Sequence, residues 1–251
     1  GSVDIDANDV DTSGMASAGI FAGAYNGTAT VKANSIATQE KYSAGVFALA
    51  TGTIDIEANE VDTFGTASAG VFAYSLAGDV DVTAHDVYTG GNYSTAILGI
   101  TGAGNVTIGS NGTVETDGDD SQGIYAFTPQ GFFNIDATIV QTHGARSDGI
   151  NGKTLDGTGS ILAATVSTDG VDSTGIYGYA NGSLLINVET VTTLGDNSPG
   201  IVGKDPLSDV QVHFGTVDTS GATDSGGIYA KSTNSFVVID SAKFGGGNYA
   251  A

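Results

Sequence analysis

Residues 54–78, with the sequence IDIEANEVDTFGTASAGVFAYSLAG, decide the fold of this chain. Three short runs within this stretch alternate apolar and polar side chains, at residues 54–58, 61–63 and 68–73. A period of two residues predicts half-buried β-strands, because successive side chains of a strand point to opposite faces. Asn, Gly and Ser, which are typical turn residues, separate the runs, so we expect three strands in this stretch.

The same pattern recurs from one end of the chain to the other, at intervals of 25–27 residues. A serine within Ser-x-Gly-Ile/Val, or a close variant, marks each unit: Ser17, Ser43, Ser68, Ser94, Ser121, Ser147, Ser173, Ser198 and Ser225. A threonine lies five or six residues before each of these serines: Thr12, Thr38, Thr63, Thr89, Thr116, Thr142, Thr168, Thr193 and Thr219. Nine full units result, and a partial tenth runs from Val237 to Phe244.

A single unit of this size does not fold alone. It buries about four large apolar side chains, a gross gain of ~6–12 kcal/mol. Ordering its backbone costs ~1–2 kcal/mol per residue, which is several times more in total. Stacked units bury a continuous core and pair each strand with its equivalents above and below. We therefore predict an all-β chain, a right-handed parallel β-helix with three strands per coil, nine full coils plus a partial one, and a length of roughly 45 Å at ~4.8 Å per coil.

Other repeat architectures do not fit. Apolar residues nowhere keep helical spacing over ~10 residues, which excludes helical solenoids, and the Leu-x-x-Leu-x-Leu signature of leucine-rich repeats is missing. Left-handed hexapeptide helices need coils in multiples of six residues, and units of 25–27 residues do not match. Residues 1–251 are interpreted as a single domain, a fragment of a longer protein in which Gly1 and Ser2 are a cloning scar.

Each position of the quoted unit has an expected place. We expect the core to contain Ile54, Ile56, Val61, Val71 and Ala73. Thr63 and Ser68 should shape the corners by satisfying backbone groups there. A regular Thr-x-Thr face would instead suggest ice binding, but no such doublet recurs. Asp55 and Glu57 should face solvent.

Charge and composition exclude several functions. Asp and Glu number 28 against 7 Lys and Arg, a net charge of −21, whereas nucleic-acid binding needs clustered basic residues. No nucleic-acid partner is expected. The chain has no Cys, so it has neither disulfides nor thiolate chemistry. No apolar run approaches ~18 residues, so no membrane insertion by this segment is expected.

The recurrent Val-x-Thr-x-Gly-x-x-Ser-x-Gly-Ile-Tyr/Phe-Ala pattern, as in residues 114–126 and 217–230, resembles the passenger domains of autotransporters (type V secretion). It is most similar to the repetitive, acidic, cysteine-free adhesin-like passengers of Gram-negative bacteria, with filamentous-haemagglutinin-like adhesins as close neighbours. The resemblance covers nearly the whole chain. It implies export as an unfolded chain through an outer-membrane barrel, folding outside, and a cell-surface, outer-membrane-attached location.

Two columns of side chains occupy the outward positions of the third strand of each unit. The first column consists of Phe21, Phe47, Phe72, Leu98, Tyr125, Asn151, Tyr177, Val202 and Tyr229. The second contains Leu49, Tyr74, Ile100, Phe127 and Tyr179, with Lys153, Lys204 and Lys231 in the later units. Exposed apolar patches usually bind something. The candidate binding residues are Phe72, Tyr74, Tyr125, Phe127, Tyr177 and Tyr179. A glycan or protein of a host or neighbouring cell, or a second copy of the chain, fits such a face; stacking that only stabilises the rod is the alternative.

Carboxylates recur on the outer face of the first run, at Asp4, Asp6, Asp55, Glu57, Asp81 and Asp136. Calcium is the natural bridging ion for such groups. The best calcium candidate is Asp117, Asp119 and Asp120, for which a solvated acidic turn is the alternative. The Gly-Gly-x-Gly-x-Asp motif of calcium-loaded β-rolls is absent, and no other cofactor is expected.

The chain is expected to have no enzymatic activity. Enzymatic β-helices build a cleft from long insertions, whereas every unit here has 25–27 residues. The three histidines, His85, His143 and His213, occupy different places within their units, and Arg146 is the only arginine. The sequence therefore indicates a non-catalytic surface rod, an adhesin or a structural stalk. A polysaccharide-acting β-helix enzyme and a surface-fibre module without its own ligand remain alternatives.

Overall fold

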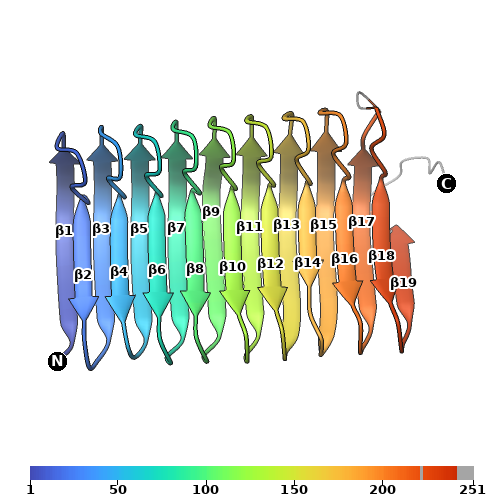
Figure 1. Ribbon diagram of the computed structural model, residues 1–251, viewed down its shortest axis with the longest axis horizontal. Coiled ribbons are helices and arrows are strands. Elements are labelled where there is room, and N and C mark those ends of the chain that lie inside the picture. The colour runs from blue at the N-terminus through green and yellow to red at the C-terminus, as the bar shows by residue number, and fades with distance from the viewer. Residues whose placement is uncertain (221–222, 242–251) are drawn as a thin grey trace.

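The computed structural model describes residues 1–220 and 223–241 as a parallel β-solenoid of about nine turns (Figure 1). Odd-numbered strands form one sheet: β1 (Val3–Thr12), β3 (Ala29–Thr38), β5 (Ile54–Thr63), β7 (Val80–Thr89), β9 (Val106–Thr116), β11 (Phe133–Thr142), β13 (Thr158–Thr168), β15 (Ser183–Thr193), β17 (Val210–Asp218) and β19 (Val237–Ser241). Even-numbered strands form the other: β2 (Ile20–Ala24), β4 (Val46–Ala50), β6 (Val71–Ser75), β8 (Ile97–Thr101), β10 (Ile124–Thr128), β12 (Ile150–Thr154), β14 (Ile176–Tyr179), β16 (Ile201–Asp205) and β18 (Ile228–Ser232). None of the described residues belongs to a helix that would be long and apolar enough to cross a membrane. The partial unit begins with β19, and Phe244 lies outside the described residues.

The three predicted runs of each unit form two strands rather than three. The first two runs join into one long odd-numbered strand, because the backbone continues through the expected turn. In β5 the inward–outward alternation breaks only at Asn59 and Glu60, which both point outward. The strand pairing skips this position, and Asn59 donates a hydrogen bond to Asn34 of the previous coil at 3.0 Å. An irregularity inside one strand therefore replaces the predicted turn.

Each strand pairs in parallel with its equivalent in the next coil. Ile54 is the partner of Val80, and Asp55 is the partner of Asp81. The register therefore superposes equivalent positions of successive units, as the repeat predicts. Residues about 26 positions apart in the sequence become neighbours, so columns of side chains run the length of the rod.

The core lies between the inner faces of the two sheets. All five predicted core residues of the quoted unit are buried: Ile54, Ile56, Val61, Val71 and Ala73. Asp55 and Glu57 are exposed, which confirms the predicted alternation. The inward column of Ile and Val continues through the other coils and forms one cluster.

Phe133 is an exception among the buried side chains, because most of its counterparts are Ile or Val. Its ring fits because two neighbouring positions are glycine. A Cβ atom at Gly159, its partner in the next coil, would lie 2.3 Å from the ring. A Cβ atom at Gly152, on β12, would lie 2.4 Å from it. The large side chain is accommodated by two small ones, which keeps the packing dense without distorting the sheets.

Each coil turns from the odd sheet to the even sheet at a corner that we call the Thr–Ser corner, built from the recurring Thr and Ser. The Thr63 hydroxyl donates to the carbonyl of Ser68 at 2.8 Å within one coil. The Ser94 hydroxyl accepts the N–H of Ser68 at 3.0 Å and donates to the carbonyl of Gly65 at 3.1 Å, both in the preceding coil. Thr63, Ser68 and Ser94 are fully buried. The predicted structural role of these hydroxyl groups is confirmed.

The residue before each corner serine has a left-handed backbone conformation. Ala67, for example, has a φ of 56°, and an equivalent residue occurs in each of the nine full coils. Left-handed geometry costs ~1–2 kcal/mol for a residue with a Cβ atom. The turn directs the Ala67 N–H along the rod, where it donates to the carbonyl of Asn92 at 2.8 Å. The hydrogen bond between coils therefore offsets part of the backbone strain at this residue.

Candidate functional site

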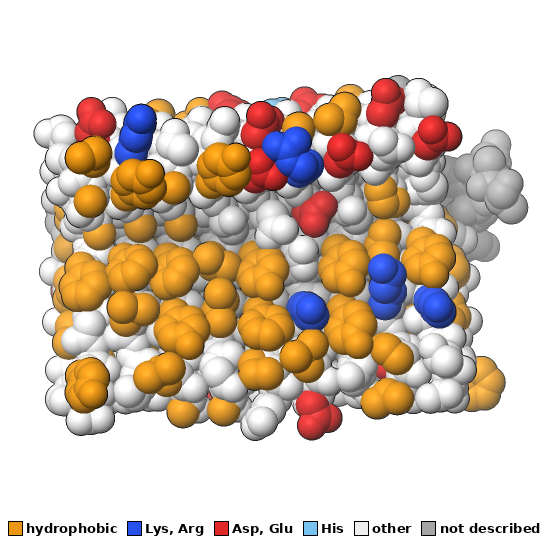
Figure 2. Space-filling model, in the orientation of Figure 1, with side chains coloured by type: hydrophobic (Ala, Val, Ile, Leu, Met, Phe, Trp, Pro, Cys, Tyr) orange, Lys and Arg blue, Asp and Glu red, His pale blue; other side chains and the backbone are white. Residues whose placement is uncertain are grey.

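The outer face of the even-strand sheet carries the two predicted columns of apolar and aromatic side chains. Figure 2 shows them as rows of hydrophobic side chains along the rod, interrupted by Lys and Arg toward the C-terminal end. The pairing of β4 with β6 places Phe47 beside Phe72 and Leu49 beside Tyr74. Most of these side chains are half-buried, because their neighbours in the column cover part of each ring. We call this surface the aromatic face.

The N-terminal part of the aromatic face is apolar and uncharged. The ring centroids of Phe21 and Phe47 lie 5.6 Å apart, and those of Phe47 and Phe72 lie 4.8 Å apart, in both cases stacked. Phe21 is 60% exposed at the start of this stack. Beside the stack is an open groove of about 330 Å³, lined by Phe21, Gly23, Ala24, Tyr25, Leu49, Ala50, Thr51, Tyr74 and Leu76. The groove arises partly because Gly23 has no side chain in the second column.

The C-terminal part of the aromatic face combines aromatic rings with lysines. The Lys153 ammonium lies 6.0 Å from the ring centroid of Phe127 and 5.7 Å from that of Tyr179. Lys204 lies 5.3 Å from the Tyr177 centroid and 5.9 Å from that of Tyr229. These are distances at which a cation is attracted to the π-face of a ring. The structure therefore brings the lysines and the predicted aromatic residues into one surface.

Partial burial changes the titration of two tyrosines on this face. Burial raises the pKa of Tyr125. Burial, followed by electrostatic interactions with Tyr179 and Asp148, raises the pKa of Tyr177. Both phenols therefore keep their protons at neutral pH and can donate hydrogen bonds. A flat array of rings with hydroxyl groups at its surface suits a ligand that has both apolar and polar edges.

The outer face of the odd-strand sheet has the opposite character. Asp55 and Asp81 are partners in adjacent strands, and burial followed by the charge of Asp55 raises the pKa of Asp81. Like charges at this spacing repel each other. Lys32 offsets part of the repulsion through an ion pair with Glu57 at 3.0 Å. Both side chains of that pair are more than half exposed, so its contribution to stability is small.

The three aspartates predicted as a calcium candidate each bind a different partner. Asp117 accepts a hydrogen bond from the hydroxyl of Tyr88 at 2.6 Å, which raises the pKa of that tyrosine to about 12. Asp119 accepts the backbone N–H of Ala145 at 2.8 Å. Asp120 forms a two-pronged ion pair with Arg146, with both N–O distances at 2.7 Å, and this pair lowers the pKa of Asp120.

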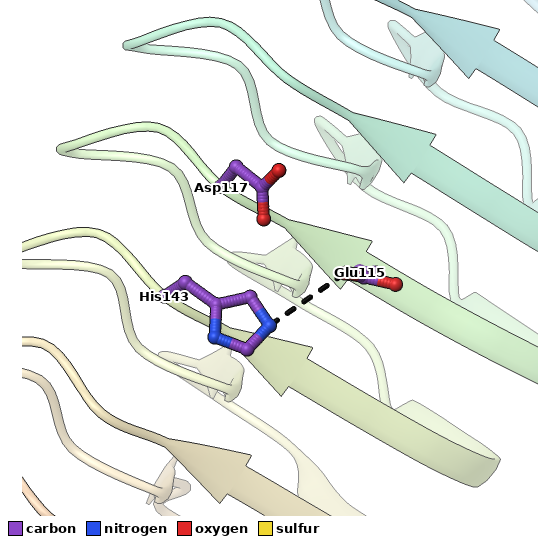
Figure 3. Close-up of side chains that lie close together, drawn as sticks. All are labelled: Glu115, Asp117 and His143. Atoms are coloured by element: carbon purple, nitrogen blue, oxygen red, sulfur yellow. Dashed lines mark ion pairs between the residues drawn. The ribbon is translucent and has the colours of Figure 1, made fainter.

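Asp117 instead lies close to Glu115 and His143, as Figure 3 shows. One ligand atom from each of the three residues lies within 4.8 Å of the others. His143 Nε2 is 3.6 Å from a Glu115 oxygen, and His143 Nδ1 is 2.9 Å from Asp169 of the next coil. This is the group of described residues that could hold a metal ion, through an imidazole nitrogen and two carboxylates.

A protonated histidine accounts for the same arrangement without a metal. The hydrogen bond that His143 donates to Asp169 raises the pKa of His143, and the charges of Asp169, Asp117 and Glu115 raise it further against the effect of partial burial. An imidazolium between carboxylates relieves the repulsion among them. A metal ion would have to displace that proton. We therefore describe this group as an exposed ion-pair network.

A sequence signal for the network exists, although the place of each histidine within its own unit does not reveal it. Asp117, His143 and Asp169 are 26 residues apart, which is the length of a unit, so the parallel register stacks them in one column. Asp120 and Arg146 are also 26 residues apart. Comparing equivalent positions of adjacent units would have predicted both pairings.

One buried carboxyl group was not anticipated. Asp205 is completely buried at the end of β16, where other coils have Thr, Ser or Ala. Thr154 at this position donates to the carbonyl of Gly131. Asp205 Oδ1 accepts the N–H groups of Leu207 and Ser208, at 2.9 and 2.7 Å, while Oδ2 has no partner among the described residues. The carboxyl group keeps the accepting role of the hydroxyl but not its bond to the preceding coil.

Comparison with protein-family models, curated proteins and solved structures finds no match to this chain. Function is therefore inferred from the two chemically different faces of the solenoid and from the geometry of their side chains.

Proposed function

We propose that this chain is a rigid, non-catalytic rod that binds glycans through the aromatic face. The observation that carries the proposal is the concentration of half-exposed rings on one outer face, while the opposite face carries carboxylates. Monomeric soluble proteins rarely expose continuous apolar patches of more than a few hundred Å² without a partner. Stacking between Phe rings accounts for only three of these rings, Phe21, Phe47 and Phe72. The other rings of the face do not belong to these stacked pairs.

Glycans fit this face because of its chemistry and its repetition. Aromatic rings present flat apolar surfaces to the C–H faces of sugars, and the tyrosine hydroxyls supply hydrogen bonds. Equivalent side chains recur on each coil at ~4.8 Å, so a chain of sugars contacts several coils at once. Several weak contacts on one rigid support add up to useful avidity.

A protein of this design serves as a surface adhesin or as a stalk that holds binding patches away from a cell. The cysteine-free solenoid of about nine turns is compatible with the passenger domain of an autotransporter. We extend the proposal to that secretion route and to attachment at a Gram-negative outer membrane. Sequencing the parent gene tests this part: a C-terminal outer-membrane β-barrel would support it, and a parent gene without one would contradict it.

A glycan array tests the binding proposal. The wild-type chain is expected to bind a subset of glycans, and the double substitution Tyr125→Ala with Tyr177→Ala should weaken binding at least tenfold, because truncating an aromatic anchor costs ~2 kcal/mol or more. The matched control is Leu162→Ala with Leu185→Ala, which removes exposed apolar side chains from the odd-strand sheet. The control should bind like the wild type.

Two outcomes would contradict the proposal. If wild type and control bind no glycan, the aromatic face has another partner or only a structural role. If the wild type dimerises in sedimentation velocity and the Tyr125→Ala, Tyr177→Ala variant does not, the face mediates self-association. Release of reducing or unsaturated ends from polysaccharides would instead assign the chain to the polysaccharide-acting enzymes.

A further inference from the structure

The positive charges of this acidic protein are unevenly placed. The chain has only seven Lys and Arg residues against 28 Asp and Glu. Three of the seven, Lys153 on β12, Lys204 on β16 and Lys231 on β18, occupy the second column of the aromatic face. The strand pairing places them in the order Phe127, Lys153, Tyr179, Lys204, Lys231. Figure 2 shows basic side chains on this face toward its C-terminal end.

Aromatic rings rather than carboxylates lie beside the ammonium groups of Lys153 and Lys204. Lys153 lies over the rings of Phe127 and Tyr179, and Lys204 lies over those of Tyr177 and Tyr229. Within residues 1–220 and 223–241, no carboxylate oxygen lies within 4.0 Å of Lys153, Lys204 or Lys231. By contrast, Lys32 and Arg146 are paired with Glu57 and Asp120. The lysines of the aromatic face therefore keep their charge available for an anion.

We infer that Lys153 and Lys204, together with Tyr177 and Tyr179, form a subsite for a carboxylated sugar, an inference that rests on the glycan-binding function proposed above. A sugar ring stacked on Tyr179 lies between the coils of Lys153 and Lys204, which are the two neighbours of that coil. Its carboxylate then reaches one of the two ammonium groups, ~5 Å away along the rod. Rings supply contact area, and the lysines supply selectivity for charge.

The overall charge favours a sugar with few carboxylates over a dense polyanion. A net charge of −21 repels nucleic acids and heavily sulfated chains before they reach the face. A glycan with one carboxylate per sugar carries less charge for the same contact area. The ammonium groups attract it locally, within the Debye length of ~8–10 Å at physiological salt.

An acidic peptide fits the subsite less well. Extended peptides usually bind by adding a strand to a free sheet edge, where main-chain groups are unpaired. The subsite lies in the middle of the sheet, where β12, β14 and β16 pair with one another and use those groups. Only side chains face the ligand, and rings with ammonium groups match a saccharide ring with a carboxylate.

The test compares a uronic-acid tetrasaccharide with its methyl ester, which has the same rings but no charge. Both are titrated into the intact chain by calorimetry at low and at physiological salt. The wild type should bind the acid roughly three- to tenfold more tightly than the ester, the size expected from two partly exposed charge pairs. This preference should shrink as the salt concentration rises.

Substitutions show which side chains cause the preference for the acid over the ester. Lys153→Gln with Lys204→Gln should bring the acid-to-ester ratio close to one, because the ammonium groups that attract the carboxylate are removed. Lys41→Gln removes the same kind of charge from an exposed turn and should keep the ratio. Tyr177→Ala with Tyr179→Ala should weaken both probes, because it removes the rings on which either sugar stacks.

The outcomes separate the subsite from the glycan-binding function. If the wild type binds acid and ester equally well, or if the lysine variant keeps the preference, the subsite is wrong and glycan binding stands. If neither probe binds, both the subsite and the proposed function fail. If a tetraglutamate peptide binds as tightly as the acid, the lysines recognise acidic protein segments, and the assignment to sugars is overturned.

Discussion

In every full coil the chain passes from the Thr–Ser corner, which is buried in all but the first and ninth coils, directly into an even-numbered strand, whose outer face is open to solvent. The corner is nearly the same in all nine full coils: a Thr, a left-handed residue and a Ser recur at fixed positions. The aromatic face changes along the rod, from stacked Phe at the N-terminal end to Tyr with Lys farther on. The comparison indicates that the corner maintains the fold, whereas the fold leaves the side chains of the face free to vary.

The corner is where a single substitution should be most damaging. Ser94→Ala removes the hydroxyl that bonds the N–H of Ser68 and the carbonyl of Gly65, both in the preceding coil. We expect the free energy of unfolding to fall by about 2–4 kcal/mol, because each buried polar group left without a partner costs ~1–3 kcal/mol. Urea unfolding followed by circular dichroism measures this loss.

Ser167→Ala is the matched control, since Ser167 is a half-buried outward residue of β13. It should change the free energy of unfolding by no more than ~0.5 kcal/mol, as surface substitutions usually do. Equal losses in the two variants would show that the corner hydroxyls have no special role, and the contrast between corner and face would disappear.

A substitution in the aromatic face should be milder. Phe47→Ala breaks both stacked pairs, at 5.6 Å to Phe21 and 4.8 Å to Phe72. We expect a loss of about 1–2 kcal/mol, because an aromatic pair contributes ~0.5–1.5 kcal/mol beyond its area and the ring is only half-buried. Phe47→Leu keeps apolar area and should recover about half of the loss. A larger loss than that of Ser94→Ala would make stacking, not binding, the main role of this end of the face.

The smallest expected effect is on the ion-pair network beside the corner. The pKa of His143 is raised in the folded chain, chiefly by its hydrogen bond with Asp169, above the ordinary value of about 6.5. Its contribution to stability is therefore complete below pH ~6.5 and is lost as the pH rises through the raised value. The wild type should exceed His143→Gln in stability by less than ~1 kcal/mol at pH 6, since the pair is partly exposed, and the difference should vanish near pH 9.

Urea midpoints at the two pH values measure this difference in stability. Asp169→Asn tests whether the hydrogen bond with Asp169 causes it. With Asp169 removed, the raised pKa loses its main source, so replacing His143 should matter less at pH 6. A stability difference that grows with rising pH would contradict the assignment of His143 as the protonated partner.

The sequence predicted the repeat, the alternation and the columns, because all three follow from a period of two inside a period of about 26. Ile56 and Val71 are buried and Asp55 is exposed, as alternation requires. The merging of two runs into one strand was not predicted, since Asn59 is as compatible with a strand irregularity as with a turn. The fit of Phe133 against Gly152 and Gly159 joins two sheets and two coils, which no local pattern reveals.

The candidate site was predictable in part for the same reason. Outward columns follow from alternation, so Tyr125 and Tyr177 were correctly placed on one face. The positions of the lysine ammonium groups over rings depend on side-chain rotamers, which alternation does not determine. The contact of Asp117 with His143 rather than Asp119 depends on register between coils, which outweighs proximity in the sequence.

The bonds between coils also dictate how such a chain acquires its structure. Those of the Thr–Ser corner join residues 25–30 positions apart, and the strand ladders join adjacent units in the same way. Within residues 1–220 and 223–241, the strands contact only strands of the same or an adjacent coil. Each coil that has formed is a template for the next, so folding propagates from whichever group of neighbouring coils forms first. A chain of this kind can gain length by duplicating units without a new folding problem, and each added unit brings another row of side chains to the surface.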